Sequence, residues 1–283
     1  MNAMVLEGGT FRPIFSCGVM DALLDHDINF DYVIGVSAGI TDGVSYVSKQ
    51  KERNYNILMN YRHDKRYVGL RNYLTDRSLF GLKFAYETIP KEIYPFDWET
   101  YQNSPTEIRV GVTNIETGEA EYLDGKELEE TCSMLKATCA IPFVFPPIEI
   151  NGKKYYDGGI CDPIPVRKAE ADGHGKMLIV LTRPKGYIKT LSKANVQAAK
   201  MLRKKYPKLV GPLMTRHILY NETVAYCEQL EREGRAVLLR PTKEIQIDSF
   251  EKDLEKIDKI YRYGYELAVE NLDKIKEICF SQK

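Results

Sequence analysis

Cysteine and histidine are scarce in this sequence, and their spacing argues against a disulfide framework or a metal site. The 283 residues contain six cysteines and four histidines. They form no C-x-x-C pair and no mixed Cys/His cluster, which are the usual signs of a metal site or a redox motif. We therefore expect reduced thiols, no metal and no disulfide, which is the usual state of a protein of the cytoplasm.

The N-terminal sequence lacks a basic segment followed by a long apolar run, so it does not predict a signal peptide. No apolar stretch approaches the roughly 20 residues that cross a bilayer as a helix. We expect a cytoplasmic protein, and any membrane contact would be peripheral, at the inner membrane surface.

An excess of charge of either sign is also missing. Forty basic and 40 acidic side chains give a formal net charge of zero, which argues against nucleic acid as a partner. Hydrophobic residues make up 43% of the chain. This content suits one large domain, or a core with an appendage.

The clearest motif lies between a predicted strand and a predicted helix. Tyr32–Ile34 is a short apolar run, Gly35-Val36-Ser37-Ala38-Gly39 has the form G-x-S-x-G, and residues 40–47 have helical spacing. Strand, sharp turn and helix are the context of a nucleophile elbow, which exposes a serine hydroxyl at the edge of a sheet. The alternative is an ordinary helix start that Ser37 caps.

A second glycine-rich turn precedes this one. A short strand at Met4–Leu6 leads into Gly8-Gly9-Thr10-Phe11-Arg12, and a helix is expected from Phe15 to Leu24. The resulting βαβα unit predicts a parallel sheet with a right-handed crossover. The glycine turn fits neither G-x-G-x-x-G nor the P-loop pattern, so a nucleotide-binding domain is poorly supported. It could instead form an oxyanion hole or be a plain turn; its place beside Ser37, at the carboxyl ends of the strands, favours the oxyanion hole.

Residues 49–101 combine aromatic and basic side chains. The segment could be a lid or a substrate-entry region, and basic and aromatic residues together could also bind nucleic acid. The neutral net charge weakens the second interpretation. For most of these residues we favour a helical subdomain with tyrosines packed at its margins. The aromatic residues are Tyr55, Tyr61, Tyr67, Tyr73, Phe80, Phe84, Tyr86, Tyr94, Phe96, Trp98 and Tyr101.

The middle of the chain predicts strands around a candidate base. Residues 107–113 and 119–123 alternate as two neighbouring strands, a helix is expected over 126–139, and Asn151-Gly152 is a hairpin turn. Asp157 then leaves a strand into Gly158-Gly159, so it could take the proton of a serine. The alternatives are an Asx turn at Asp157 and a triad with His174, which follows in the order Ser…Asp…His.

Three motifs occur in the order and spacing of the patatin-like phospholipases, whose patterns are G-G-x-x-(K/R)-G, G-x-S-x-G and D-G-(G/A). They are the segments that begin at Gly8, Gly35 and Asp157, and the resemblance covers roughly Met4 to Thr182. It implies a three-layer α/β/α fold with a central, mostly parallel sheet. It also implies a Ser–Asp dyad without histidine, and hydrolysis of acyl esters of lipids or phospholipids.

Carried onto this sequence, the resemblance makes Ser37 the nucleophile and Asp157 the base, and it implies no cofactor. Gly8, Gly9 and Thr10 would form the oxyanion hole, and Arg12 would brace their loop or neutralise charge. Supporting positions would be Gly35, Gly39, Gly158 and Gly159. The sequence departs from the family at Thr10, where a small residue is common, and at Pro13, where glycine is usual. Proline removes one N–H, and one lost oxyanion donor can cost about 3 kcal/mol in the transition state.

The C-terminal hundred residues differ in character. Lys176–Thr182 is expected to be the last strand of the core, which suggests a catalytic domain over residues 1–185 and a mainly helical extension over 186–283 packed on it. A helix over 215–233, a strand over 235–240 and a final helix capped by Asp248 or Ser249 are predicted. Residues 173–221 contain no acidic side chain. This basic block could attract anionic lipid, but we favour pairing with the acidic residues Glu251, Asp253, Glu255 and Asp258.

The sequence therefore predicts a serine acyl-ester hydrolase that acts on lipid or other acyl-ester substrates. Acyl transfer to another acceptor would use the same residues. The alternative from another class is a non-catalytic ligand-binding or regulatory protein that keeps this fold, with Thr10 and Pro13 as its only support. The oligomeric state is not indicated.

Overall fold

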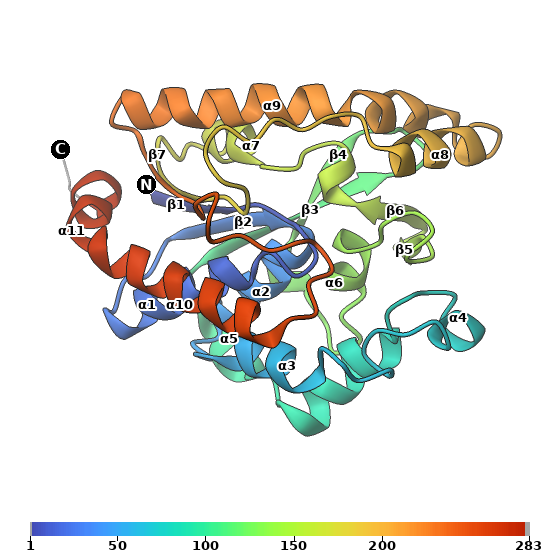
Figure 1. The fold of residues 1–283 in the computed structure, drawn as a ribbon, viewed down its shortest axis with the longest axis horizontal. Helices are drawn as coiled ribbons and strands as arrows, with labels where there is room; N and C mark the ends of the chain where they lie inside the picture. Colours follow the sequence, from blue (N-terminus) through green and yellow to red (C-terminus); the bar gives the residue numbers. More distant parts are fainter. Residues whose placement is uncertain (1, 281–283) are drawn as a thin grey trace.

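A mixed, mostly parallel sheet forms the centre of the computed structural model, which describes residues 2–280 (Figure 1). The strand order is β5-β6-β3-β2-β1-β7-β8, and β4 pairs with β3. The pairs among β3, β2, β1, β7 and β8 are parallel, and the pairs β3–β4, β3–β6 and β5–β6 are antiparallel. The strands are β1 (Asn2–Leu6), β2 (Tyr32–Val36), β3 (Glu107–Asn114), β4 (Ala120–Asp124), β5 (Ile148–Ile150), β6 (Lys153–Asp157), β7 (Lys176–Val180) and β8 (Ala236–Leu239).

Helices cover both faces of the sheet, as expected for parallel strands. In Figure 1, α7 and α9 lie above the sheet, and α1, α2 and α10 lie below it. The α-helices are α1 (Ile14–Asp25), α2 (Ser37–Val47), α3 (Arg53–Tyr61), α4 (Asn72–Thr75), α5 (Trp98–Asn103), α6 (Ser133–Thr138), α7 (Val166–Ala171), α8 (Lys193–Leu202), α9 (Val210–Arg232), α10 (Leu254–Glu270) and α11 (Leu272–Ile275). Two π-helices span Phe84–Ile93 and Lys276–Phe280. The three-layer α/β/α fold predicted from the sequence is confirmed.

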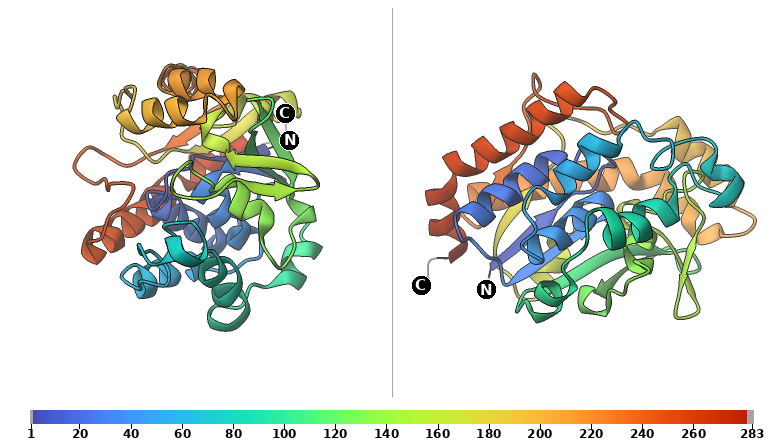
Figure 2. Two further views of the ribbon diagram at one scale, coloured as in Figure 1. Left: turned by 90° about the vertical axis from the view of Figure 1, so that its right-hand side faces the viewer. Right: turned by 90° about the horizontal axis from the view of Figure 1, so that it is seen from below.

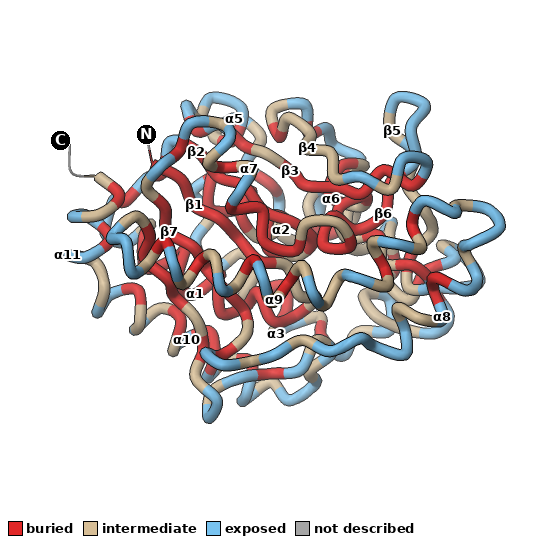
Figure 3. Tube along the Cα trace, turned by 90° about the horizontal axis from the view of Figure 1, so that it is seen from above, coloured by how far each residue is buried: buried red, intermediate tan, exposed pale blue. Residues whose placement is uncertain are grey.

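The core follows from the alternation of side chains along the strands. On β1, Ala3 and Val5 belong to the cluster beneath α7 and α9, whereas Met4 and Leu6 belong to the cluster against α1, α2 and α10. All five residues of β1 are buried. Figure 3 shows the central strands as a continuously buried trace, while α8, at the end of the molecule, is exposed except on the side of Ala198 and Ala199.

The prediction that residues 176–182 form the last strand is wrong, because β8 pairs with β7 in parallel from Met177↔Ala236 to Val180↔Leu239. The long helix α9 makes the crossover between these two strands, and β8 is buried along its length. A domain boundary near residue 185 stays a prediction, and the central sheet includes a strand from each side of it.

The C-terminal helix α10 packs closely on α1 (Figure 2). A Cβ atom at Gly18 of α1 would lie 2.0 Å from the carbonyl oxygen of Tyr261, and one at Gly264 of α10 would lie 2.2 Å from the carbonyl oxygen of Phe15. The two backbones are therefore in direct contact. The Tyr261 hydroxyl also donates a hydrogen bond to Asp21 at 2.7 Å.

Two helix starts differ from the sequence predictions. The helix expected over 126–139 is confined to α6. Cys132 precedes α6 and has a φ of 53°, a left-handed conformation that cannot be part of an α-helix, so the helix does not extend further toward the N-terminus. The final helix begins at Leu254, not after Asp248 or Ser249. The Asp253 side chain caps the helix by accepting hydrogen bonds from the backbone N–H groups of Glu255 and Lys256.

The predicted pairing between the basic block and the acidic tail is wrong for the part of the chain that is described. Asp258 binds Arg262 and Tyr55 instead. The five most closely spaced basic residues are exposed and take part in no ion pair among residues 2–280; they are Lys200, Arg203, Lys204, Lys205 and Lys208. No helix within the same range has both the length and the apolar character required to span a bilayer.

Candidate active site

Ser37 lies at the turn between β2 and α2, where the sequence predicted a nucleophile elbow. Its φ is 55°, a left-handed conformation that is uncommon for a residue with a side chain. Its Oγ donates a hydrogen bond to Oδ2 of Asp157 at 2.7 Å. Both residues are buried, with 6% and 5% of their surface exposed. Two residues that are 120 positions apart in the sequence thus form a direct pair.

Asp157 is the last residue of β6 and is held on both carboxylate oxygens. Oδ1 accepts a hydrogen bond from the N–H of Gly159 at 2.7 Å, and Oδ2 accepts the one from Ser37. Burial raises the pKa of Asp157; the bond from Ser37, the charge of Arg216 and the bond from Gly159 oppose this rise. Gly158 allows the turn to approach β3, because a Cβ atom there would lie 2.2 Å from the carbonyl oxygen of Gly111.

Thr138 is a buried positioning residue that the sequence analysis missed. Its Oγ1 accepts a hydrogen bond from the N–H of Ser37 at 2.8 Å and donates one to the carbonyl of Gly111 at 2.6 Å. The side chain has no exposed surface. It therefore links the strained turn to β3. A single threonine at the end of α6 belongs to no motif, so only the fold reveals it.

The loop that follows β1 passes directly over Ser37. A Cβ atom at Gly8 would lie 2.8 Å from Cβ of Ser37, and Thr10 has a φ of 59°. Within residues 2–280, no acceptor is assigned to the N–H groups of Gly8, Gly9 or Thr10. The carboxyl end of β1 therefore presents free donors next to the serine. Gly35 and Gly39 lie on either side of the elbow, facing the backbone of Leu6 and Glu7.

Arg12 is buried against this loop. Its Nε donates a hydrogen bond to Thr182 at 3.2 Å, its guanidinium also binds Ser249, and it lies 3.9 Å from the carboxylate of Glu7. The Thr182 hydroxyl in turn donates to the carbonyl of Gly8 at 3.2 Å. Pro13 lines neither of the two cavities at Ser37. Its missing N–H is at the start of α1, a position where proline is well tolerated.

No histidine lies near the pair among the described residues that line the cavities. His174 stacks on Tyr32 with ring centroids 4.0 Å apart. Tyr32 begins β2, whereas Ser37 follows its end, so His174 lies at the opposite end of the strands. The alternative triad is therefore not formed. Among residues 2–280, no group of three or more His, Cys, Asp and Glu side chains could hold a metal ion.

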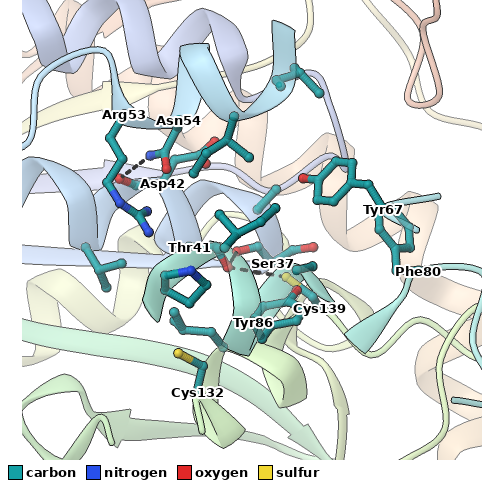
Figure 4. A pocket seen from close by; sticks show the side chains of 18 of the residues that line it. Ser37, Thr41, Asp42, Arg53, Asn54, Tyr67, Phe80, Tyr86, Cys132 and Cys139 are labelled. Atoms are coloured by element: carbon teal, nitrogen blue, oxygen red, sulfur yellow. Dashed lines mark hydrogen bonds between the residues drawn. The ribbon is translucent and has the colours of Figure 1, made fainter. Parts of the chain in front are cut away.

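Two cavities meet at Ser37. The first has a volume of about 150 Å³ and is mostly apolar (Figure 4). Tyr67 and Tyr86, tyrosines of the segment that we expected at the margins of a helical subdomain, instead line this cavity, together with Phe80, Phe96 and Trp98. Asp42, Arg53 and Asn54 lie together at one end, where burial raises the pKa of Asp42 to about 7.

The second cavity, of about 260 Å³, shares Thr10, Ser37 and Ile141 with the first. It includes both members of the pair and the glycine loop. It also includes the side chains of Arg12, Arg183, Lys189 and Arg216. Three of these cations lie beyond residue 182, so the C-terminal part of the chain contributes to the site. They lie far from the motifs and follow no recognisable spacing, which is why the sequence did not identify them.

Comparison with known proteins shows which families the sequence matches. The pattern of the family described as patatin-like phospholipase matches residues 4–170, and a domain of unknown function, DUF6363, matches residues 206–280. The uncharacterized protein YjjU of Escherichia coli is 24% identical over 196 residues, covering 64% of this chain and 52% of YjjU. Lysophospholipase nte1 of Aspergillus terreus is 25% identical over 292 aligned residues, covering 96% of this chain and 18% of that enzyme.

The chain thus spans about half of YjjU and less than a fifth of the fungal lysophospholipase. Lysophospholipase NTE1 of Scheffersomyces stipitis is similar at 26% identity, with 94% of this chain and 17% of that enzyme covered. Among solved structures, VipD of Legionella pneumophila aligns with 96% of this chain and 66% of its own, at a TM-score of 0.48 and 16% identity.

Proposed function

Because the chain belongs to the patatin-like phospholipase family, we propose that it hydrolyses acyl esters of lipids or phospholipids through Ser37 and Asp157. The observation that carries the proposal is the buried hydrogen bond of 2.7 Å from Ser37 Oγ to Asp157 Oδ2. A serine needs a base within this distance to act as a nucleophile near neutral pH.

In the proposed first step, Asp157 takes the proton of Ser37 as Oγ attacks the ester carbonyl. The negative charge moves to the carbonyl oxygen, where the free N–H groups of Gly8, Gly9 and Thr10 would stabilise it. The intermediate then collapses, and Asp157 gives its proton to the departing alcohol. An acyl group remains on Ser37.

The second step reverses these roles with water. Asp157 removes a proton from water as the water oxygen attacks the acyl-enzyme, and the proton then returns to Ser37 as the fatty acid leaves. The bond from the N–H of Gly159 holds the Asp157 carboxylate through both steps, because it does not involve the acylated oxygen. We place the acyl chain in the apolar cavity, whose lining includes Ser37 and many aromatic rings.

We also propose a peripheral contact with the inner membrane surface from the cytoplasm. Leu70 and Leu74 are 79% and 88% exposed, and Phe143, which lines the second cavity, is 43% exposed. Tyr73, which lies between the two leucines in the sequence, donates a hydrogen bond to the carbonyl of Phe143 at 2.8 Å. Lys193 and Lys200 of α8 are exposed, as are Arg203, Lys204 and Lys205 directly after it, and α8 lies at the same end of the molecule as α4 (Figure 1). Apolar side chains beside cations are the combination that binds anionic bilayers. Co-flotation with phosphatidylglycerol vesicles, lost in Leu74→Ser, is the expected result; equal flotation with neutral vesicles would refute the role of charge.

Hydrolysis of short and long p-nitrophenyl esters tests the catalytic proposal. We expect turnover by the wild type, none by Ser37→Ala or Asp157→Asn, and undiminished turnover by His174→Ala. Loss of activity in the last variant, with a normal melting temperature, would contradict a mechanism without histidine. A folded wild type that hydrolyses no ester would favour the alternative of a non-catalytic binding protein.

A further inference from the structure

The position of Asp157 determines which cavity receives the alcohol part of the substrate. This inference rests on the proposed function. Asp157 lines the second cavity and is absent from the lining of the apolar one. The group that protonates the leaving alcohol must lie within hydrogen-bond reach of it. The alcohol therefore enters the second cavity, whereas the acyl chain lies in the apolar one.

This second cavity contains more cations than carboxylates. Arg12, Arg183, Lys189 and Arg216 line it, and its only acidic lining residues among those described are Glu7 and Asp157. The Glu7 carboxylate already has partners. It accepts hydrogen bonds from the N–H of Thr182 at 2.7 Å and from the hydroxyl of Tyr220 at 3.2 Å, and it lies 3.9 Å from Arg12.

Three of the four cations, Arg183, Lys189 and Arg216, take part in no ion pair within residues 2–280. Arg183 forms no ion pair, and its buried Nε has no hydrogen-bond partner. Its guanidinium lies over the ring of Tyr187 at 4.6 Å, and the Nζ atom of Lys189 lies over the ring of Tyr220 at the same distance. Both side chains are half-buried, and a charge that is partly removed from water without an acidic partner is costly, so an anion would complete the arrangement.

The electrostatics show that these groups act on one another. Burial, together with the positive charges of Arg216, Arg12 and Arg183, lowers the pKa of Lys189 to about 7, while Glu7 opposes the change. Arg216 is fixed by donating a hydrogen bond to the carbonyl of Gly159, the turn that also holds Asp157. The cationic cluster is therefore attached directly to the turn of the proposed base.

We propose that Arg12, Arg183, Lys189 and Arg216 form a binding site for a phosphate group on the alcohol side of Ser37, so that the preferred substrates are acyl esters with an anionic phosphate headgroup. Arginine and lysine are the side chains that bind phosphate through charge-assisted hydrogen bonds. A quaternary ammonium group would be repelled here, and the two tyrosine rings that could bind it already face Arg183 and Lys189.

The test compares two substrates that differ only in the phosphate: 1-oleoylglycerol 3-phosphate and 1-oleoylglycerol, in the same neutral detergent micelles. We expect the ratio of their kcat/KM values to favour the phosphate ester by about tenfold or more, since hydrogen bonds between charged groups are the strong ones. A ratio near one, with both esters hydrolysed, would overturn this inference and leave the proposed hydrolase intact. Failure to hydrolyse either ester or any p-nitrophenyl ester would overturn both.

Variants then assign the preference to the cluster. Arg183→Gln and Lys189→Gln should each reduce the ratio by about tenfold, and Lys189→Arg should keep most of it. Lys185→Gln is the matched control, because Lys185 belongs to the same segment but is exposed and lines neither cavity. Melting temperatures identify variants that do not fold. An unchanged ratio in folded Arg183→Gln and Lys189→Gln would refute the assignment.

A final arm separates a lipid headgroup from free phosphate. Inorganic phosphate is added while hydrolysis of 1-oleoylglycerol 3-phosphate and of 1-oleoylglycerol is followed in turn. If the cluster receives the headgroup, phosphate should compete with 1-oleoylglycerol 3-phosphate, and the substrate preference should be present. Binding of inorganic phosphate without any preference between the two lipids would show a free-anion site and refute the headgroup assignment.

Discussion

Replacing Thr138 with valine tests whether the elbow depends on one buried hydroxyl. The two side chains have nearly the same shape, so the change removes hydrogen bonds without creating a large cavity. The N–H of Ser37 would lose its acceptor and the carbonyl of Gly111 would lose its donor, at present 2.8 and 2.6 Å from Thr138 Oγ1. A buried polar group left without a partner costs about 1–3 kcal/mol. For the two groups we therefore expect the free energy of unfolding to fall by about 2 kcal/mol or more.

The catalytic effect of Thr138→Val should exceed the effect on stability. The hydroxyl holds the backbone of Ser37 at a φ of 55°, and a misplacement of about 1 Å can cost about 100-fold in rate. We expect kcat to fall by about this factor with KM little changed, because neither cavity includes Thr138. The assay is ester hydrolysis at a temperature well below the melting transition, with denaturant unfolding measured in parallel.

Thr138→Ser is the matched control, since it keeps the hydroxyl and removes only a methyl group. It should retain most of the activity even though it loses some packing energy. If Thr138→Val were less stable but had wild-type kcat, the residue would be structural only, and the argument that it positions Ser37 would be refuted.

Three further predictions concern the base, the acyl cavity and the C-terminal helix. Because the base must be ionised and burial raises the pKa of Asp157 above its ordinary value of 3.8, kcat/KM should be lost as the pH falls through that raised pKa; a profile flat down to pH 4 would contradict this. Ala85→Phe narrows the apolar cavity, so it should reduce hydrolysis of long-chain p-nitrophenyl esters far more than that of short-chain ones, and equal losses would argue against an acyl site there. Gly18→Ala places a methyl 2.0 Å from the carbonyl oxygen of Tyr261 and should destabilise the protein by about 1–3 kcal/mol. Gly211→Ala, where no neighbour lies within 4 Å, should not.

The turn chemistry of the site could be predicted because it is local. The segments around Ser37 and Asp157 each contain a strand, glycines and a reactive side chain within a few residues. Because they occur in the order that the family pattern requires, the sequence predicted that they share one site. Their direct contact required the parallel order β1, β2, β3 and the antiparallel addition of β6. Thr138 could not be predicted, because its importance depends on contacts made only in three dimensions.

The C-terminal half was harder to predict for the same reason. The apolar run 236–239 indicates a strand but does not tell which sheet it joins. Lys189 and Arg216 come from a loop and from α9, and only the fold places them in one cavity with Arg12. The close contact of α10 with α1 depends on two glycines, Gly18 and Gly264, which are 246 positions apart and have no local signature.

Mapping the adduct of a fluorophosphonate probe is the most direct test of the central claim. The probe reacts with activated serines, and peptide mass spectrometry identifies the residue that carries the phosphonyl group. We predict a single adduct on Ser37, absent in Ser37→Ala and strongly reduced in a folded Asp157→Asn variant. An adduct on another serine, or labelling of Ser37 that does not depend on Asp157, would contradict a Ser37–Asp157 pair as the catalytic centre.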